Sequence, residues 1–235
     1  MLHSLTGAFV NGITIIICSL LGKFILKRLP QRVEDIINKA LGLCILYIGI
    51  SGALNNQRVM LLILSMVIGS ALGEWIGIET RMNQVGTWAE SKLGFGEGNF
   101  SKGFVTASVI FCTGSMAVIG GMNSGLQANH EMLFAKSILD GVFSIILTSS
   151  ISIGVAFSSI PVFLYEGAIA LGSSFVKDLL TPEIITEMAA VGSLILVALG
   201  LNFLLDKQIP VANMIPAIFL PWLLISLETA LQLPF

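Results

Sequence analysis

The sequence predicts an all-α fold, a polytopic membrane helix bundle with about seven or eight transmembrane segments. Of the 235 residues, 55% are hydrophobic and only 11% are charged, whereas a soluble domain carries about 25% charged residues. Mean hydropathy is +0.92. A soluble core could not bury this much apolar surface, so lipid must be the solvent over much of the chain.

Apolar stretches recur along the chain and predict its elements in order, because a spanning helix needs about 20 mostly apolar residues. The whole of 1–235 therefore reads as a single transmembrane domain. The sixth stretch is short and carries Glu166, so its crossing stays open. Between the third and fourth stretches, residues 79–103 are polar and are expected to form an interfacial helix with Trp88 and then a glycine-rich loop. The predicted segments are 5–26, 38–54, 59–78, 104–126, 133–158, 161–176, 184–205 and 209–227.

The fourth segment contains CTGSMAVIGGMNSGL, residues 112–126, which holds four glycines in an apolar setting. Each glycine weakens a helix by about 1 kcal/mol relative to alanine. One interpretation is a broken or re-entrant helix whose backbone amides and polar side chains bind a small solute or ion. The other is tight helix packing through small residues. The polar candidates in this stretch are Thr113, Ser115, Asn123 and Ser124.

Asp140 is the most informative ionisable residue. A charge at the bilayer centre costs about 2.5–3.5 kcal/mol on insertion scales, so it needs a partner or water. Lys136 shares its helix face at the i,i+4 spacing, although we expect this lysine to extend to the interface. Asp140, Ser144 and Thr148 form one polar stripe, which suits either a water-lined path or hydrogen bonds between helices.

Three further residues are candidate binding groups. Asn11 lies near the outer end of the first segment. Glu187 lies one turn inside the seventh segment, after a helix start at Thr181 and Pro182. Whether its side chain faces a cavity stays open. Asn213 lies between two prolines and is expected to serve carbonyl groups freed by a kink.

A weak internal repeat is visible. VNGITIIICS at 10–19 resembles LDGVFSIILT at 139–148, and EDIINKALG at 34–42 resembles PEIITEMAAVG at 182–192. The predicted repeat halves are 1–78 and 133–235, joined by 79–103 and 104–126. Segments one, two and three would pair with five, seven and eight. Whether the repeat is inverted depends on whether 104–126 and 161–176 cross.

Lysine and arginine set the expected orientation in a bacterial cytoplasmic (inner) membrane. If all segments cross, nine of the twelve cations lie on one side of the membrane and three on the other, which are Arg58, Lys136 and Lys177. The N-terminus is therefore expected outside and the 27–39 loop in the cytoplasm. The nine are Lys23, Lys27, Arg28, Arg32, Lys39, Arg81, Lys92, Lys102 and Lys207.

Several function classes find no support in the sequence. The three cysteines lie in apolar runs without metal spacing, and neither histidine lies in a span, so no metal site, cofactor or catalytic arrangement is expected. We expect no enzyme. A net charge of −2 without a basic block argues against a nucleic-acid partner. No nucleotide motif is present, so ATP would not drive transport.

The chain resembles the bacterial family called domain of unknown function 554, the YqgA/YdfK-like multi-pass membrane proteins. The stretches that carry the resemblance are GAFVNGITIIICSLLGKF, FCTGSMAVIGGMNSGL, FAKSILDGVFSI and TPEIITEMAAVGSLILVALGLNFL followed by VANMIPAIF. The resemblance covers nearly the whole chain and implies a multi-pass membrane protein with a role in transport. It implies no particular substrate or site residue.

The sequence thus favours a secondary transporter for a small solute or ion, with a central polar site at a broken helix. A proton or sodium gradient would drive it through Asp140 or Glu187. The alternatives are a passive channel and a membrane scaffold without a solute. Lipid is the expected partner, and small-residue faces make a homodimer plausible.

Overall fold

The computed structural model describes residues 3–25, 31–93, 99–176, 180–205 and 209–231, and over these ranges the chain is helical without a strand. The first six helices are α1 (Thr6–Ile25), α2 (Gln31–Ala53), α3 (Val59–Ile76), α4 (Ile78–Leu93), α5 (Phe100–Cys112) and α6 (Ser115–Gln127). The others are α7 (Glu131–Ser150), α8 (Gly154–Phe157), α9 (Ser159–Val176), α10 (Pro182–Leu204), the 3₁₀ helix η2 (Val211–Phe219) and α11 (Leu220–Leu231), with a short 3₁₀ turn η1 (His3–Leu5) before α1.

The predicted membrane fold is confirmed. Among the described residues, seven helical stretches are long and apolar enough to cross a membrane, and one bent pair brings the number to eight. The amphipathic helix α4 is not among them. The seven are His3–Phe24, Asp35–Ala53, Val59–Ile76, Glu131–Ser150, Gly154–Phe175, Pro182–Leu204 and Val211–Glu228.

The chain divides into two compact units. The first contains α1 and the helices from α4 to α9. The second contains most of α2, together with α3, α10, η2 and α11. The short link 113–115 between α5 and α6 belongs to the second unit.

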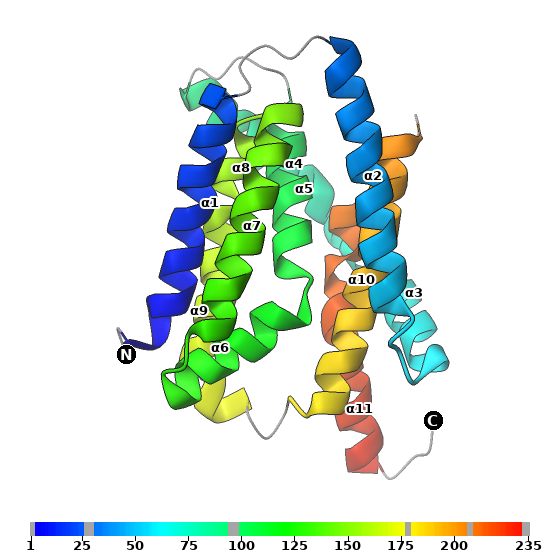
Figure 1. Ribbon diagram of the computed structural model, residues 1–235. Helices are drawn as coiled ribbons and strands as arrows, with labels where there is room; N and C mark the ends of the chain where they lie inside the picture. Colours follow the sequence, from blue (N-terminus) through cyan, green and yellow to red (C-terminus); the bar gives the residue numbers. More distant parts are fainter. Residues whose placement is uncertain (1–2, 26–30, 94–98, 177–179, 206–208, 232–235) are drawn as a thin grey trace. The chain divides into compact units, whose positions relative to one another are not determined.

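The predicted break in the fourth segment is confirmed. Helices α5 and α6 are bent by 64° at Thr113 and Gly114 (Figure 1). The other three glycines of the stretch lie inside α6 and serve packing instead. A Cβ atom at Gly121 would lie 2.9 Å from Ile169 Cγ2, and one at Gly120 would lie 2.8 Å from Leu133 Cδ2. The helix is therefore broken at Gly114, and the other three glycines serve close packing, while binding of a solute or ion at the break stays a prediction.

The fifth and sixth segments have other boundaries than the sequence predicted. Helix α7 ends at Ser150, and Gly154–Phe175 forms a span of 22 residues. Pro161 does not open this span. It lies in the first turn of α9, where its missing N–H leaves no hydrogen bond unmade. The sixth segment is therefore long enough to cross the membrane.

Helix α1 packs on two neighbours in the first unit. Helices α1 and α7 are parallel, because Gly7 lies against Leu133 and Gly22 lies against Ile145. Figure 1 shows the two helices side by side. Contacts with α9 run in the opposite direction, because Gly12 meets Ser159 whereas Leu5 meets Gly167.

Two antiparallel pairs dominate the second unit. Gly42 meets Phe203 whereas Gly52 meets Ser193, so α2 and α10 run in opposite directions. Helix α3 and η2 are also antiparallel, with Gly69 at Ala217 and Gly73 at Asn213.

The repeat halves 1–78 and 133–235 remain a prediction, but their internal pairing needs revision. If a single symmetry operation relates the two halves, every pair of corresponding helices must have the same relative direction, either parallel or antiparallel. The pair α1 and α7 is parallel, whereas α2 with α10 and α3 with η2 are antiparallel. Taking α9 as the partner of α1 makes all three pairs antiparallel, which is the relation expected of an inverted repeat.

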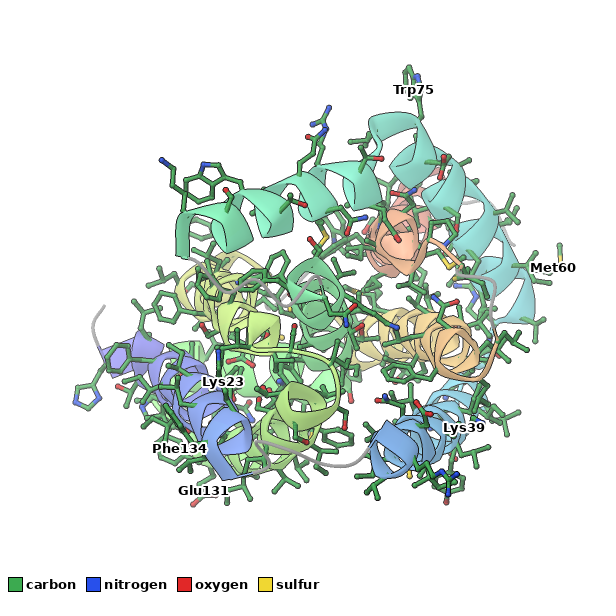
Figure 2. The ribbon with its side chains drawn as sticks, turned by 90° about the horizontal axis from the view of Figure 1, so that it is seen from above. Lys23, Lys39, Met60, Trp75, Glu131 and Phe134 are labelled. Atoms are coloured by element: carbon green, nitrogen blue, oxygen red, sulfur yellow. The ribbon has the colours of Figure 1, made fainter. Side chains whose placement is uncertain are left out.

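A tight corner joins α3 to α4. Gly77 adopts φ 71° and its N–H caps the carbonyl groups of Gly73 and Glu74, a conformation that costs glycine little. Close to the corner, the Trp75 side chain is 86% exposed and points outward (Figure 2). On α4 the Trp88 side chain is 64% exposed, in keeping with an interfacial position for this helix.

Part of the predicted charge asymmetry lies outside the described residues. This applies to Lys27, Arg28, Lys177 and Lys207.

The packing predicts opposite effects for two glycine substitutions. In Gly125→Ala the new Cβ would lie 2.8 Å from the carbonyl carbon of Ala170, so we expect a loss of about 1–3 kcal/mol. The control Gly172→Ala meets nothing within 4 Å and should gain up to about 1 kcal/mol from helix propensity. Thermal unfolding in detergent measures both. Equal effects would contradict the close contact of α6 with α9.

Candidate functional site

Among the described residues, three transmembrane helices each carry an asparagine, aspartate or glutamate followed directly by glycine. The structure joins the three polar side chains by hydrogen bonds in the first unit, and Lys136 of α7 joins them. We call Asn11, Lys136, Asp140 and Glu166 the Asn–Lys–Asp–Glu cluster. The pairs are Asn11-Gly12 in α1, Asp140-Gly141 in α7 and Glu166-Gly167 in α9.

The glycines explain how short side chains from separate helices can meet. A Cβ atom at Gly141 would lie 2.9 Å from Thr14 Cγ2, and one at Gly167 would lie 3.2 Å from Leu5 Cδ2. Small residues let transmembrane helices approach closely. The polar neighbour of each glycine is thereby brought within hydrogen-bond reach of the facing helix.

The cluster is a closed ring of two donors and two acceptors. Asn11 Nδ2 donates to Asp140 Oδ2 at 3.0 Å and to Glu166 Oε1 at 2.9 Å. Lys136 Nζ pairs with the same two oxygens, closely with Asp140 and at 3.3 Å with Glu166. The amide orientation of Asn11 follows from its partners, because both are carboxylate oxygens and require a donor.

The ring is buried and carries unequal charge. The exposed fractions of the side chains are 6% for Lys136, 9% for Asp140 and 0% for Glu166. One ammonium faces two carboxylates, so the ionised cluster has a net charge of −1. A buried charge without a partner is strongly unfavourable. One added proton or one monovalent cation makes the cluster neutral.

Two buried atoms of the ring, Asn11 Oδ1 and Glu166 Oε2, have no hydrogen-bond partner among the residues that the structure describes. Both are acceptors, and both N–H groups of the Asn11 amide are already used. A buried acceptor without a partner costs about 1–3 kcal/mol. A hydrogen-bond donor or a cation would therefore satisfy these two oxygens.

Hydroxyl groups extend the polar region along α7. Ser144 and Thr148 follow Asp140 at helical spacing, are buried, and their oxygens have no hydrogen-bond partner. Ser150 Oγ is in the same state. Ser152, which the predicted stripe would include next, instead donates to the carbonyl oxygen of Asn99 at 2.9 Å. The stripe thus ends within α7.

The polar residues of the broken segment do not join the cluster through any hydrogen bond of the described residues. Thr113 is buried against Gly192 of α10, and Ser115 is the first residue of α6. Asn123 is half-buried within α6. From Ser115 onward the chain forms the regular helix α6, and a site at the break that includes all four side chains stays a prediction.

Ser124 holds α6 against the start of the chain. Its hydroxyl donates to the carbonyl oxygen of Ser4 at 2.8 Å and lies 2.7 Å from His130 Nδ1. Since the one hydroxyl proton goes to Ser4, His130 Nδ1 must be the donor to Ser124. His130 Nε2 is then an acceptor in the neutral ring, and it is buried without a partner.

Glu187 lies in the second unit and is fully buried. Its Oε1 accepts the backbone N–H of Gln57 at 2.8 Å, and its Oε2 has no hydrogen-bond partner. Thr181 caps α10 at Ile184 as predicted. Nearby on the chain, Arg58 pairs with Glu228 at 2.6 Å, and this hydrogen bond raises the pKa of the guanidinium.

Asn213 does not serve carbonyl groups freed by a kink. Its Nδ2 donates to Glu74 Oε2 at 2.6 Å, and its Oδ1 accepts the N–H of Glu79 at 2.7 Å. Glu79 Oε2 in turn accepts the N–H of Ala212 at 3.0 Å. The side chain thus ties η2 to the corner between α3 and α4, and the prolines produce a 3₁₀ helix of nine residues.

Two of the four cluster residues were not among the predicted site residues. Lys136 was expected to extend to the interface but is buried in the ring. The depth of Glu166 was open because its segment looked short. A signal for Glu166 exists in the sequence, since Glu166-Gly167 repeats the pattern of Asn11-Gly12 and Asp140-Gly141. For Lys136 the signal is its i,i+4 spacing from Asp140.

Comparison with known proteins places the chain in a family. The family model described as "Protein of unknown function (DUF554)" matches residues 6–226, which include the whole Asn–Lys–Asp–Glu cluster. The chain belongs to the DUF554 family. This confirms the resemblance seen in the sequence.

Two DUF554 relatives align over nearly their full length. "Uncharacterized membrane protein YdfK" of Bacillus subtilis (strain 168) is 28% identical over 233 residues, 97% of this chain and 99% of the relative. "Uncharacterized protein YqgA" of Escherichia coli (strain K12) is 30% identical over 229 residues, 95% of this chain and 97% of the relative. No solved structure matches.

The charge count predicts unequal effects within the ring. Lys136→Met leaves two buried carboxylates without a cation, and we expect a loss of about 3–5 kcal/mol. Asp140→Asn leaves one positive and one negative charge and should cost clearly less. Lys39→Met, on the exposed part of α2, is the control. Chemical unfolding in detergent measures all three. A larger loss in Asp140→Asn than in Lys136→Met would contradict the excess negative charge.

Glu79, which lies outside the membrane spans, should make the stability of the protein depend on pH. Partial burial raises its pKa from 4.5, opposed by the Ala212 N–H and aided by Glu74. The folded state therefore binds this proton more tightly than the unfolded state, and stability falls as pH rises from 4.5 through the raised pKa. Compared with Glu79→Gln, the wild-type protein should lose thermal stability over this window. A parallel pH profile for both proteins would contradict the raised pKa.

Proposed function

We propose that this DUF554 protein is a secondary transporter whose coupling site is the Asn–Lys–Asp–Glu cluster. The observation that carries the proposal is a buried ring in which one lysine faces two carboxyl groups, whose side chains are at most 9% exposed. Ionisable residues inside transmembrane segments are expensive and mark ion or proton pathways by default. A purely structural ring would be more stable with matched charges.

The surroundings of the cluster support a carrier. Helix α5 and all of α6 after Ser115 lie in the same unit as the cluster, and α5 contributes Phe111, whose ring centre is 5.9 Å from Lys136 Nζ. Interrupted helices beside a buried polar site are typical of secondary transporters. The antiparallel pairing of α1 with α9, α2 with α10 and α3 with η2 supports an inverted repeat, the architecture in which two halves alternate around a fixed site.

The proposed mechanism assigns one role to each ring residue. Asp140 and Glu166 carry the coupling proton or sodium ion, Lys136 holds the second negative charge in balance, and Asn11 fixes the separation of the carboxylates. The buried hydroxyls of Ser144 and Thr148 suit a water-lined path toward the end of α7. Glu187 is not assigned to coupling, because its Oε1 holds the loop at Gln57.

The proposal extends to location and partners. We place the chain in a bacterial inner membrane with the N-terminus outside and the 27–39 loop in the cytoplasm. The unequal distribution of cations supports this orientation, and more strongly now that Lys136 belongs to a buried ion pair rather than a loop. A small solute, lipid and a homodimer are the proposed partners, and we propose transport rather than an enzymatic reaction.

A ligand screen tests the function. Detergent-purified protein is heated with small metabolites and ions, and a true substrate at 100 times its dissociation constant should add about 2.7 kcal/mol of stability. Asp140→Asn and Glu166→Gln should lose the shift and the gradient-driven uptake of that solute into proteoliposomes. Glu183→Gln, half exposed at the start of α10, should keep both.

Two results would contradict the proposal. Uptake that survives both cluster substitutions unchanged would remove the coupling site. Flux that does not saturate with solute concentration, with no stabilising compound, would favour a passive pore over a carrier.

A further inference from the structure

We infer that the Asn–Lys–Asp–Glu cluster binds a hard monovalent cation of the sodium class at Asn11 Oδ1 and Glu166 Oε2, in exchange for a proton. This inference rests on the proposed function and names the ion that the site takes. Both atoms are buried, belong to side chains with 0% exposure, and have no hydrogen-bond partner.

The chemistry of the unpartnered atoms decides the class of ligand. Both are oxygen acceptors, so an anion or a ligand that offers only acceptors gains nothing there. Carboxylate and amide oxygens suit hard cations rather than soft transition metals.

The charge of the ligand follows from the ring. Lys136 already balances one of the two carboxylates, so a single positive charge neutralises the cluster. A divalent ion would leave a buried excess of +1. The nearby end of α5 also favours a cation, because the C-terminus of a helix carries partial negative charge. Cys112, the last residue of α5, interacts electrostatically with Lys136, Asp140 and Glu166.

The charges of the ring also predict that the cation competes with a proton. The proton and the cation both neutralise the one excess negative charge, so they exclude each other. Among the described residues, Cys112 of α5 and Tyr165 of α9 also interact electrostatically with residues of the ring. Neither offers a second positive charge. Lowering the pH should therefore weaken cation binding.

Sodium itself is the probe for the experiment. The full chain in detergent is titrated with NaCl against choline chloride at constant ionic strength, and thermal stability is followed at several pH values. We expect stabilisation by sodium and lithium, with an apparent dissociation constant that rises by up to about tenfold per unit fall in pH, since one proton leaves for each ion bound. Glu166→Gln should lose the sodium response, and Glu183→Gln should keep it.

Proteoliposomes give a second readout that does not depend on stability. A pulse of external sodium should make the interior of wild-type vesicles alkaline, because protons leave as sodium enters, and a pulse of choline should not. Vesicles with Glu166→Gln should show no pH change.

Three outcomes would overturn the inference. These are equal stabilisation by sodium and choline, a sodium response that Glu166→Gln leaves unchanged, and stabilisation by ammonium but not by lithium, which would indicate a hydrogen-bond donor. Solute transport that depends on the cluster but not on sodium would sink the inference and leave the proposed function standing. A sodium response without any transported solute would support the inference and contradict the solute transport in the proposed function.

Discussion

A buried ammonium held between two carboxylates is the interaction on which the first unit depends. Lys136 pairs with Asp140 of its own helix and with Glu166 of α9, and Asn11 of α1 bridges the same two oxygens. Inside a membrane these groups cannot be satisfied by lipid, so each must find its partner within the protein. The ring therefore holds α1, α7 and α9 together in addition to their apolar contacts.

Glycine makes that arrangement sterically feasible. Each polar residue from α1, α7 and α9 precedes a glycine that contacts a facing helix, and α6 uses Gly120, Gly121 and Gly125 in the same way. Hydrophobic burial does not hold helices together in lipid as it does in water, so close packing and hydrogen bonds must do so. The second unit follows the same rule, with Gly49 against Val197 and Gly73 against Asn213.

The two units use buried polar groups differently. In the second unit Asn213 is satisfied on both sides by Glu74 and Glu79, and one oxygen of Glu187 accepts from Gln57. Those contacts join loops and helix ends, which is a structural use. Glu187 keeps one unsatisfied oxygen, whereas the ring of the first unit combines two carboxyl groups, one lysine and two unsatisfied acceptors inside spanning helices. That difference is the physical basis for placing function at the ring and not at Glu187.

The sequence by itself determined the membrane class, most span boundaries, the break near Gly114 and the importance of Asp140, because apolar length, glycine content and a charge in an apolar run are local properties. It did not determine that Lys136 turns inward, that Glu166 completes the ring, or that Asn123 and Ser124 stay away from it. Those facts depend on which faces of α1, α6, α7 and α9 meet. Contacts between residues 129 and 155 positions apart are decided by helix packing, and only the tertiary structure contains that information.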